Sequence, residues 1–219
     1  MASGKAPSGE ERRARLRRAR LYVVTDSRQA QGDLPGFLDA ILTAGVDIVQ
    51  LREKEAEAGD IIRWARVFRV VADRHGALFM INDRADLALA CEADGVHVGQ
   101  NDLPAQWARR VMGPELIVGL SCHSAEDHDA APAEADYLTA GPVWWTPTKP
   151  GRPGVGLDLL KRAAIKVRRP WFAIGGIDAE SVHEVALTGA KRIAVVRAVT
   201  KAEDPARAVR SLLGGLPWR

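Results

Sequence analysis

The sequence is poor in cysteine and contains no long apolar run. Its 219 residues include two cysteines, Cys91 and Cys122. Two cysteines are too few for a disulfide framework, and they form no CxxC or Cys/His metal-binding pattern. No stretch approaches the roughly 18 consecutive apolar residues of a membrane-spanning helix. We therefore expect a cytoplasmic protein without a membrane partner.

The two glycine-rich phosphate-binding signatures are also missing. The GxGxxG motif that follows a strand in dinucleotide-binding domains does not occur, and neither does the P-loop pattern. The absence of GxGxxG argues against an open, doubly wound sheet. That sheet is the alternative fold for a chain in which strands and helices alternate.

Positive charge is concentrated at the start of the chain. Of 31 basic and 28 acidic residues, residues 1–20 hold seven and two, which leaves 24 and 26 in residues 21–219. This larger part is therefore not a basic nucleic-acid-binding surface, and we expect no nucleic-acid partner. We interpret residues 1–20 as a basic, flexible and dispensable arm, and residues 21–219 as one catalytic domain.

Eight short apolar runs alternate with segments of helical spacing. Phe37, Ile41 and Ala44 form one helical stripe, and Asp178 is a candidate N-cap for a helix that contains Val182. Eight strand–helix units in about 200 residues predict a single closed (β/α)₈ TIM barrel. The runs predict strands at 21–24, 46–51, 77–81, 95–98, 116–120, 136–140, 171–174 and 193–196.

Polar clusters follow the ends of the predicted strands from the second to the eighth. In a barrel, the loops that follow the strands converge on one rim, and barrel enzymes work at that rim. Arg52 and Lys54 lie two residues apart on an extended segment, so both can point the same way. With Lys149 they predict a cationic pocket for a polyphosphate. The alternative is surface pairing with nearby glutamates such as Glu53.

Asp83 and Asp102 follow neighbouring strands. One or two carboxylates together with substrate phosphates commonly hold Mg²⁺, so the pair indicates a metal site. Taken singly, each aspartate could instead cap the helix that follows it.

The loops after the seventh and eighth strands form the usual phosphate site of this barrel. Gly175 and Gly176 allow backbone amides to approach a ligand closely, and the loop from Gly141 to Gly156 has the composition of a polar lid. His97 and His123 lie near the rim without a recognisable Ser or Cys and acid partner, so a hydrolase triad is unsupported. Two phosphate sites, one with a metal, suggest a reaction between two phosphorylated small molecules.

An ordered set of motifs then resembles the thiamine-phosphate synthase family from about Tyr22 to Pro205. The motifs are Gln50–Lys54, Asn82–Arg84, Asp94–Gln100 with Asp102, Gly119–Ser121 with His123, Gly141–Val143, Thr146–Lys149, Ala173–Ile177 and Val195–Val196.

The resemblance implies a Mg²⁺-dependent transferase that joins hydroxymethylpyrimidine diphosphate to thiazole phosphate, giving thiamine phosphate and pyrophosphate. It implies a dissociative mechanism, in which the bond to diphosphate breaks before the thiazole nitrogen attacks. It assigns Mg²⁺ to Asp83 and Asp102, and catalytic contacts to Arg52, Lys54, Ser121 and Lys149. The pyrimidine diphosphate would be held by Gln50, Arg52, Lys54, Asn82, Ser121 and Lys149, and the thiazole phosphate by Thr146, Thr148, Gly176, Val196 and Arg197.

One position departs from the family. Residue 197 is Arg, where many members carry Ser, so the contact there is made either by the backbone amide or by the guanidinium. Two alternatives stay open: a thiazole tautomerase of the same superfamily, and a non-catalytic regulator that binds thiamine precursors. A homo-oligomer is also compatible with the sequence.

Overall fold

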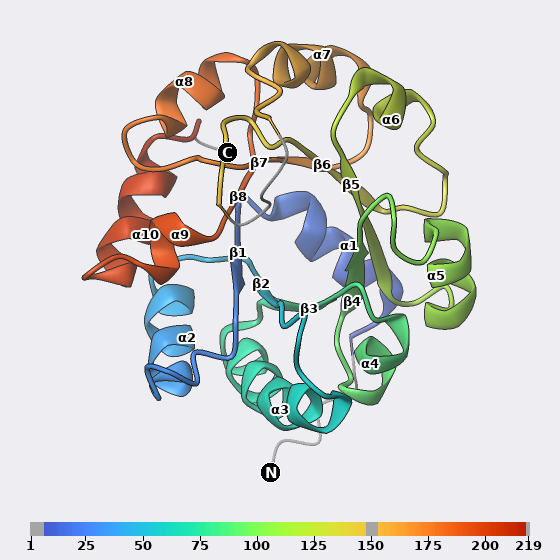
Figure 1. The fold of residues 1–219 in the computed structure, drawn as a ribbon, viewed down its shortest axis with the longest axis vertical. Coiled ribbons are helices and arrows are strands. Elements are labelled where there is room, and N and C mark those ends of the chain that lie inside the picture. Colours follow the sequence, from blue (N-terminus) through green and yellow to red (C-terminus); the bar gives the residue numbers. More distant parts are fainter. Residues whose placement is uncertain (1–6, 148–152, 218–219) are drawn as a thin grey trace.

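The computed structural model describes residues 7–147 and 153–217. Within them, eight parallel strands form a closed barrel in chain order, β1 to β8, and β8 pairs with β1. Figure 1 looks along the barrel and shows helices surrounding the strands. The strands are β1 Leu21–Thr25, β2 Ile48–Leu51, β3 Leu78–Asn82, β4 Gly95–Val98, β5 Ile117–Cys122, β6 Tyr137–Ala140, β7 Trp171–Ile174 and β8 Ile193–Val195.

The (β/α)₈ barrel is thus confirmed, and every predicted strand exists, with ends that shift by at most two residues. None of the helices in the described residues is both long enough and apolar enough to cross a bilayer. The helices are α1 Gly9–Arg18, α2 Leu34–Thr43, α3 Ala58–His75, α4 Ala85–Ala90, α5 Ala105–Met112, α6 Ala125–Asp129, α7 Asp158–Lys166, α8 Val182–Leu187, α9 Arg197–Thr200 and α10 Pro205–Gly214.

The strands are mostly apolar because both of their faces are buried. In β1, Leu21 and Val23 pack in the core between strands and helices, whereas Tyr22 and Val24 belong to the cluster inside the barrel. Successive side chains of a strand point to opposite faces, so this alternation follows from strand geometry. The inward positions are the ones that can reach the rim and its ligands.

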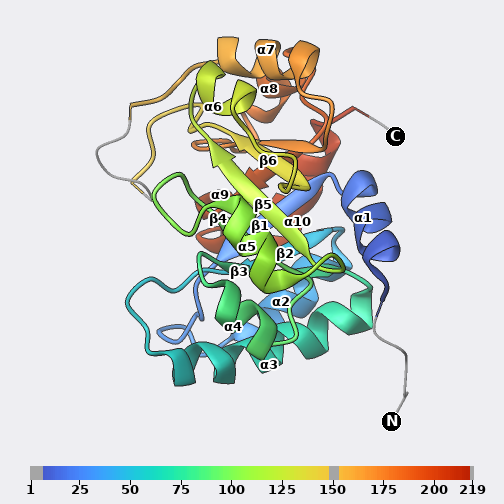
Figure 2. The ribbon, with the colours of Figure 1, turned by 90° about the vertical axis from the view of Figure 1, so that its right-hand side faces the viewer.

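The N-terminal segment differs from the flexible arm that we expected. Residues 9–18 form α1, which begins with a capping box between Ser8 and Glu11. Leu16 joins the cluster inside the barrel, and buried Arg12 pairs with Asp94 at 2.9 Å. Figure 2 shows α1 at the end of the barrel where the strands begin. The expectation of a flexible arm is therefore wrong for residues 9–18, and residues 1–6 lie outside the described part.

The helix after β7 also begins later than predicted. Ser181, not Asp178, is the N-cap of α8. The Asp178 carboxylate instead accepts hydrogen bonds from the backbone amides of Glu180 and Ser181 in a turn before the helix. The turn leaves several residues of loop between the glycine pair and α8.

Candidate active site

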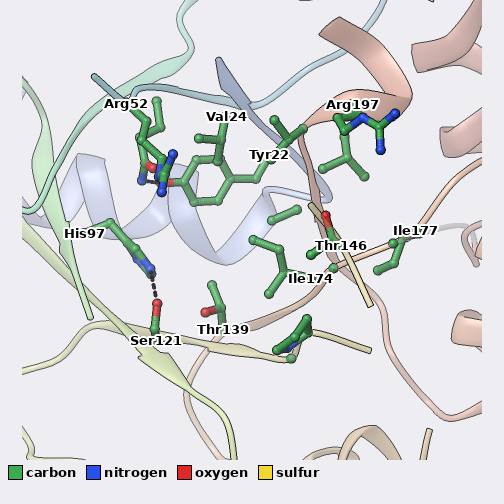
Figure 3. A pocket seen from close by; sticks show the side chains of 18 of the residues that line it. Tyr22, Val24, Arg52, His97, Ser121, Thr139, Thr146, Ile174, Ile177 and Arg197 are labelled. Atoms are coloured by element: carbon green, nitrogen blue, oxygen red, sulfur yellow. Dashed lines mark hydrogen bonds between the residues drawn. The ribbon is translucent and has the colours of Figure 1, made fainter. Parts of the chain in front are cut away.

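A cavity of about 470 Å³ opens at the carboxyl ends of the strands. Residues on or just after all eight strands line it (Figure 3). Two of the predicted site residues, Thr148 and Lys149, lie outside the described residues. The structure brings all the others together at this cavity: Gln50, Arg52, Lys54, Asn82, Asp83, Asp102, Ser121, Thr146, Gly176, Val196 and Arg197.

One side of the cavity combines a cation with two carboxylates. The ammonium of Lys54 lies 3.3 Å from the Asp83 carboxylate. Burial raises the pKa of Asp83, as does its close neighbour Asp102, while Lys54 opposes the shift. A partly buried carboxylate whose charge is destabilised by a second carboxylate suits a divalent cation. Lys54 therefore pairs with Asp83 in the cavity, and not with a nearby glutamate on the surface, which was the alternative to a cationic pocket.

Neither aspartate caps a helix. The N-cap of α4 is Arg84 and that of α5 is Pro104, and no side chain makes a capping hydrogen bond at either. The Asp102 carboxylate instead accepts a hydrogen bond of 2.8 Å from the backbone amide of Gly99, within its own loop. The capping alternative is therefore wrong for both residues. This bond within the loop orients the Asp102 carboxylate.

The opposite side of the cavity is built from backbone. Gly175 and Gly176 have φ of +102° and +72°, which favour glycine. A Cβ on Gly175 would lie 2.4 Å from the Cβ of Pro142, so the backbone of β7 and the loop after β6 are in close contact. Val196 and Arg197 stand at the start of the short helix α9. This arrangement has the form of the phosphate site that barrels place after β7 and β8.

Sequence reasoning missed a chain of hydrogen bonds that crosses the barrel interior. Gln50 Nε2 donates to Tyr22 Oη (2.5 Å), and Tyr22 Oη lies 3.1 Å from Tyr137 Oη. Tyr137 Oη lies 3.0 Å from His97 Nδ1, and His97 Nε2 lies 2.9 Å from Ser121 Oγ. All five side chains are at least nine-tenths buried. Both ends of the chain, Gln50 and Ser121, line the cavity.

The two tyrosines were hidden by the apolar runs that contain them. The alternation of side chains along a strand could have identified them as residues that point into the barrel. Tyr22 and Tyr137 occupy inward positions, as Val24 and Thr139 do two residues later. His97 had no partner that the sequence could identify. Its contact with Ser121 resembles part of a hydrolase triad. In such a triad a carboxylate would accept from Nδ1 of the histidine, but among the described residues Nδ1 of His97 is hydrogen-bonded to the Tyr137 hydroxyl.

The family described as thiamine monophosphate synthase matches residues 21–199. A thiamine-phosphate synthase of Acidothermus cellulolyticus is 53% identical over 199 residues, which cover 90% of this chain and 94% of that protein. Another, of Thermobifida fusca, is 52% identical over 206 residues, covering 93% and 94%.

A solved structure gives the same result. The thiamine phosphate pyrophosphorylase from Pyrococcus furiosus superposes with a TM-score of 0.82 at 35% sequence identity. The match covers 93% of this chain and 96% of that structure.

Proposed function

The chain belongs to the thiamine monophosphate synthase family and is a transferase that forms thiamine phosphate, and we propose that it does so with Mg²⁺ held by Asp83 and Asp102. The substrates are two small molecules, hydroxymethylpyrimidine diphosphate and thiazole phosphate. The observation that carries the metal proposal is the pair of adjacent carboxylates beside Lys54. Bound there, Mg²⁺ would neutralise negative charge on the leaving diphosphate.

The diphosphate is proposed to lie between the carboxylate pair and the cations of β2. Arg52 and Lys54 both line the cavity, and Lys54 contacts Asp83 directly. A cation beside the metal ligands places positive charge where negative charge develops as the diphosphate leaves. Lys149 is proposed as a third cation because of its position in the sequence after β6 and because of the family resemblance.

The pyrimidine ring is proposed to lie deeper in the barrel. Gln50 and Ser121 are almost fully buried and line the cavity, and Asn82, the last residue of β3, lines it as well. Buried amide and hydroxyl groups suit the nitrogens of an aminopyrimidine, because each such group requires a hydrogen-bond partner.

The thiazole phosphate is proposed to bind across the cavity from the diphosphate. Gly176, Val196 and Arg197 provide backbone at the β7–α8 and β8–α9 loops, and Thr146 provides a hydroxyl. The same assignment for Thr148 comes from the sequence resemblance. Backbone amides at such a site bind phosphate through hydrogen bonds that need no specific side chain.

We propose a dissociative substitution. The C–O bond at the pyrimidine methylene breaks and its electron pair leaves with the diphosphate, after which the lone pair of the thiazole nitrogen forms the C–N bond. This route needs no protein nucleophile. In support, Cys122, the cysteine nearest the rim, is buried, and burial raises its pKa to about 12, so its thiol stays protonated near neutral pH.

Conservative substitutions test the metal proposal. Asp83→Asn and Asp102→Asn keep the side-chain shape and remove one charge each. We expect both to retain the melting temperature and to lose about 10²–10³-fold in turnover. Thiamine phosphate formation should be measured against Mg²⁺ concentration for the wild type and both variants. High Mg²⁺ should partly restore the variant that contributes less to binding.

Asp86→Asn is the matched control, because Asp86 is exposed, pairs with Arg84 and does not line the cavity. It should keep wild-type turnover. Wild-type turnover that persists in excess chelator, or normal metal dependence in both cavity variants, would refute the metal site. Isomerisation of a thiazole without condensation would favour the tautomerase, and precursor binding without turnover would favour the regulator.

A further inference from the structure

The buried hydrogen-bonded chain connects two groups that reach the cavity from different strands. Gln50 lies on β2 and Ser121 on β5, and the chain between them passes through Tyr22 of β1, Tyr137 of β6 and His97 of β4. A role for Gln50 and Ser121 in holding the pyrimidine follows from the proposed function. The role of the three residues between them does not.

Hydrogen counting links the two ends. A phenol carries one hydrogen, and because Tyr22 and Tyr137 are almost fully buried, that hydrogen must be donated within the hydrogen-bonded chain. Each tyrosine takes part in two links, so it donates in one link and accepts in the other. Burial raises the pKa of Tyr22 and of Tyr137, and both phenols therefore keep their hydrogens. A neutral imidazole likewise has one N–H and one acceptor nitrogen. All links must then run in the same direction.

The direction follows from the first link. Gln50 Nε2 donates to Tyr22, so Tyr22 donates to Tyr137, and Tyr137 donates to Nδ1 of His97. The His97 hydrogen is then on Nε2 and is donated to Ser121 Oγ. The Ser121 hydroxyl can then donate its own hydrogen to a ligand in the cavity. At the other end, Gln50 Oε1 makes no hydrogen bond within the residues described, and it can accept one from a ligand.

We propose that Tyr22, Tyr137 and His97 are positioning residues that couple Gln50 to Ser121 and thereby select the aminopyrimidine. The coupled site offers one acceptor, Gln50 Oε1, and one donor, the Ser121 hydroxyl. An aminopyrimidine offers the complement, because its amino group donates and its ring nitrogens accept. This inference rests on the proposed function.

An oxopyrimidine presents the opposite pattern, with a carbonyl acceptor in place of the amino donor and an N–H in place of a ring nitrogen. To bind it, every link of the chain would have to reverse, or two buried polar groups would stay unpaired. Sites built to hydrogen-bond one pattern reject the other strongly, whereas apolar pockets do not. We expect the wild type to prefer the amino substrate by at least about 10²-fold in kcat/KM.

Interrupting the hydrogen-bonded chain tests the coupling between Gln50 and Ser121. Tyr137→Phe keeps the aromatic ring and removes the hydroxyl in the middle, so Gln50 and Ser121 can reorient independently. The ratio of kcat/KM for the amino- and oxopyrimidine diphosphates should fall to about 10-fold, while KM for thiazole phosphate stays unchanged. Tyr22→Phe removes the neighbouring hydroxyl of the hydrogen-bonded chain. If Tyr137→Phe does not fold, Tyr22→Phe is expected to have the same effect on the ratio.

Thr139→Val is the matched control. Thr139 lies on the same strand as Tyr137, is equally buried and lines the cavity, but it is not part of the hydrogen-bonded chain. Its selectivity ratio should equal that of the wild type. Equal losses for both substrates in Tyr137→Phe and Tyr22→Phe, with the ratio preserved, would show a merely structural role and overturn the proposal.

A second readout needs no turnover. The ¹⁵N spectrum of the ligand-free protein reports which ring nitrogen of each histidine carries hydrogen, and His97→Gln identifies the His97 signals. We expect the Nε2–H tautomer of neutral His97. A Nδ1–H tautomer or a doubly protonated ring would overturn the proposed direction. A wild type that forms no thiamine phosphate from the amino substrate would refute the proposed function instead, and this measurement would still decide the direction of the chain.

Discussion

Replacement of Arg12 tests whether α1 is an integral part of the barrel. The Arg12 guanidinium donates to one oxygen of Asp94 at 2.9 Å, and that carboxylate is only 1% exposed. Its other oxygen accepts from Arg69 and from the backbone amide of Phe79, both at 2.9 Å. Arg12→Ala removes one of the two cations that neutralise a buried charge.

The magnitude follows from what remains around Asp94. Removing one partner of a buried ion pair costs about 3–5 kcal/mol when the other charge is left uncompensated. Here Arg69 still pairs with the carboxylate, so we expect a smaller loss in the free energy of unfolding, about 2–3 kcal/mol. For a protein of this size, each kcal/mol lowers Tm by about 2–4 °C, which predicts a fall of about 4–12 °C.

The assay is thermal unfolding followed by circular dichroism, with turnover measured well below Tm. Arg18→Ala is the control, because Arg18 is exposed on the same helix, and it should change the free energy of unfolding by no more than about 0.5 kcal/mol. Turnover should be normal in both variants, since α1 lies at the end of the barrel where the strands begin (Figure 2), whereas the cavity is lined by residues at the carboxyl ends of the strands. Equal Tm values for the two variants would refute the reasoning and would support a dispensable arm.

Three further predictions concern Lys149, Gly175 and the two cysteines. Lys149→Ala should slow turnover by about 10²–10³-fold with little change in Tm, and normal turnover would place Lys149 outside the site. Gly175→Ala should lower Tm and raise KM for thiazole phosphate, because its φ of +102° and its contact with Pro142 leave no room for a Cβ, and unchanged values in both measurements would contradict this. A thiol reagent at pH 8 should modify Cys122 and Cys91 only after unfolding, since burial raises the pKa of both thiols and keeps them protonated, and rapid labelling of the native protein would disagree.

The barrel could be predicted because its signal is local. Strands buried on both faces read as continuous apolar runs, and the predicted limits of β4 and β7 coincide with the observed ones. The rim could be predicted because parallel strands bring their following loops to one end. Asp83 and Asp102 are thus neighbours across a gap of 19 residues.

The features that were missed depend on partners far away in the sequence. In α1 the buried face is formed by Gly9, Arg12 and Leu16, which does not read as an apolar stripe. Arg12 is buried only because Asp94, 82 residues later, neutralises it. The capping box of Ser8 with its glutamate three residues on was the one local signal for this helix.

The interior chain was missed for a similar reason. Tyr22 and Tyr137 lie 115 residues apart, and each alone reads as an ordinary aromatic residue in a buried strand. The cytoplasmic location and a homo-oligomer stay predictions of the sequence.

The most direct test of the account is condensation by the purified chain. The wild type should be incubated with hydroxymethylpyrimidine diphosphate and thiazole phosphate, with Mg²⁺ in one reaction and excess chelator in the other, and both products should be quantified. We predict thiamine phosphate and pyrophosphate in equal amounts with Mg²⁺ and neither product with chelator. No thiamine phosphate in either reaction, or the same yield in both, would contradict a Mg²⁺-dependent synthase.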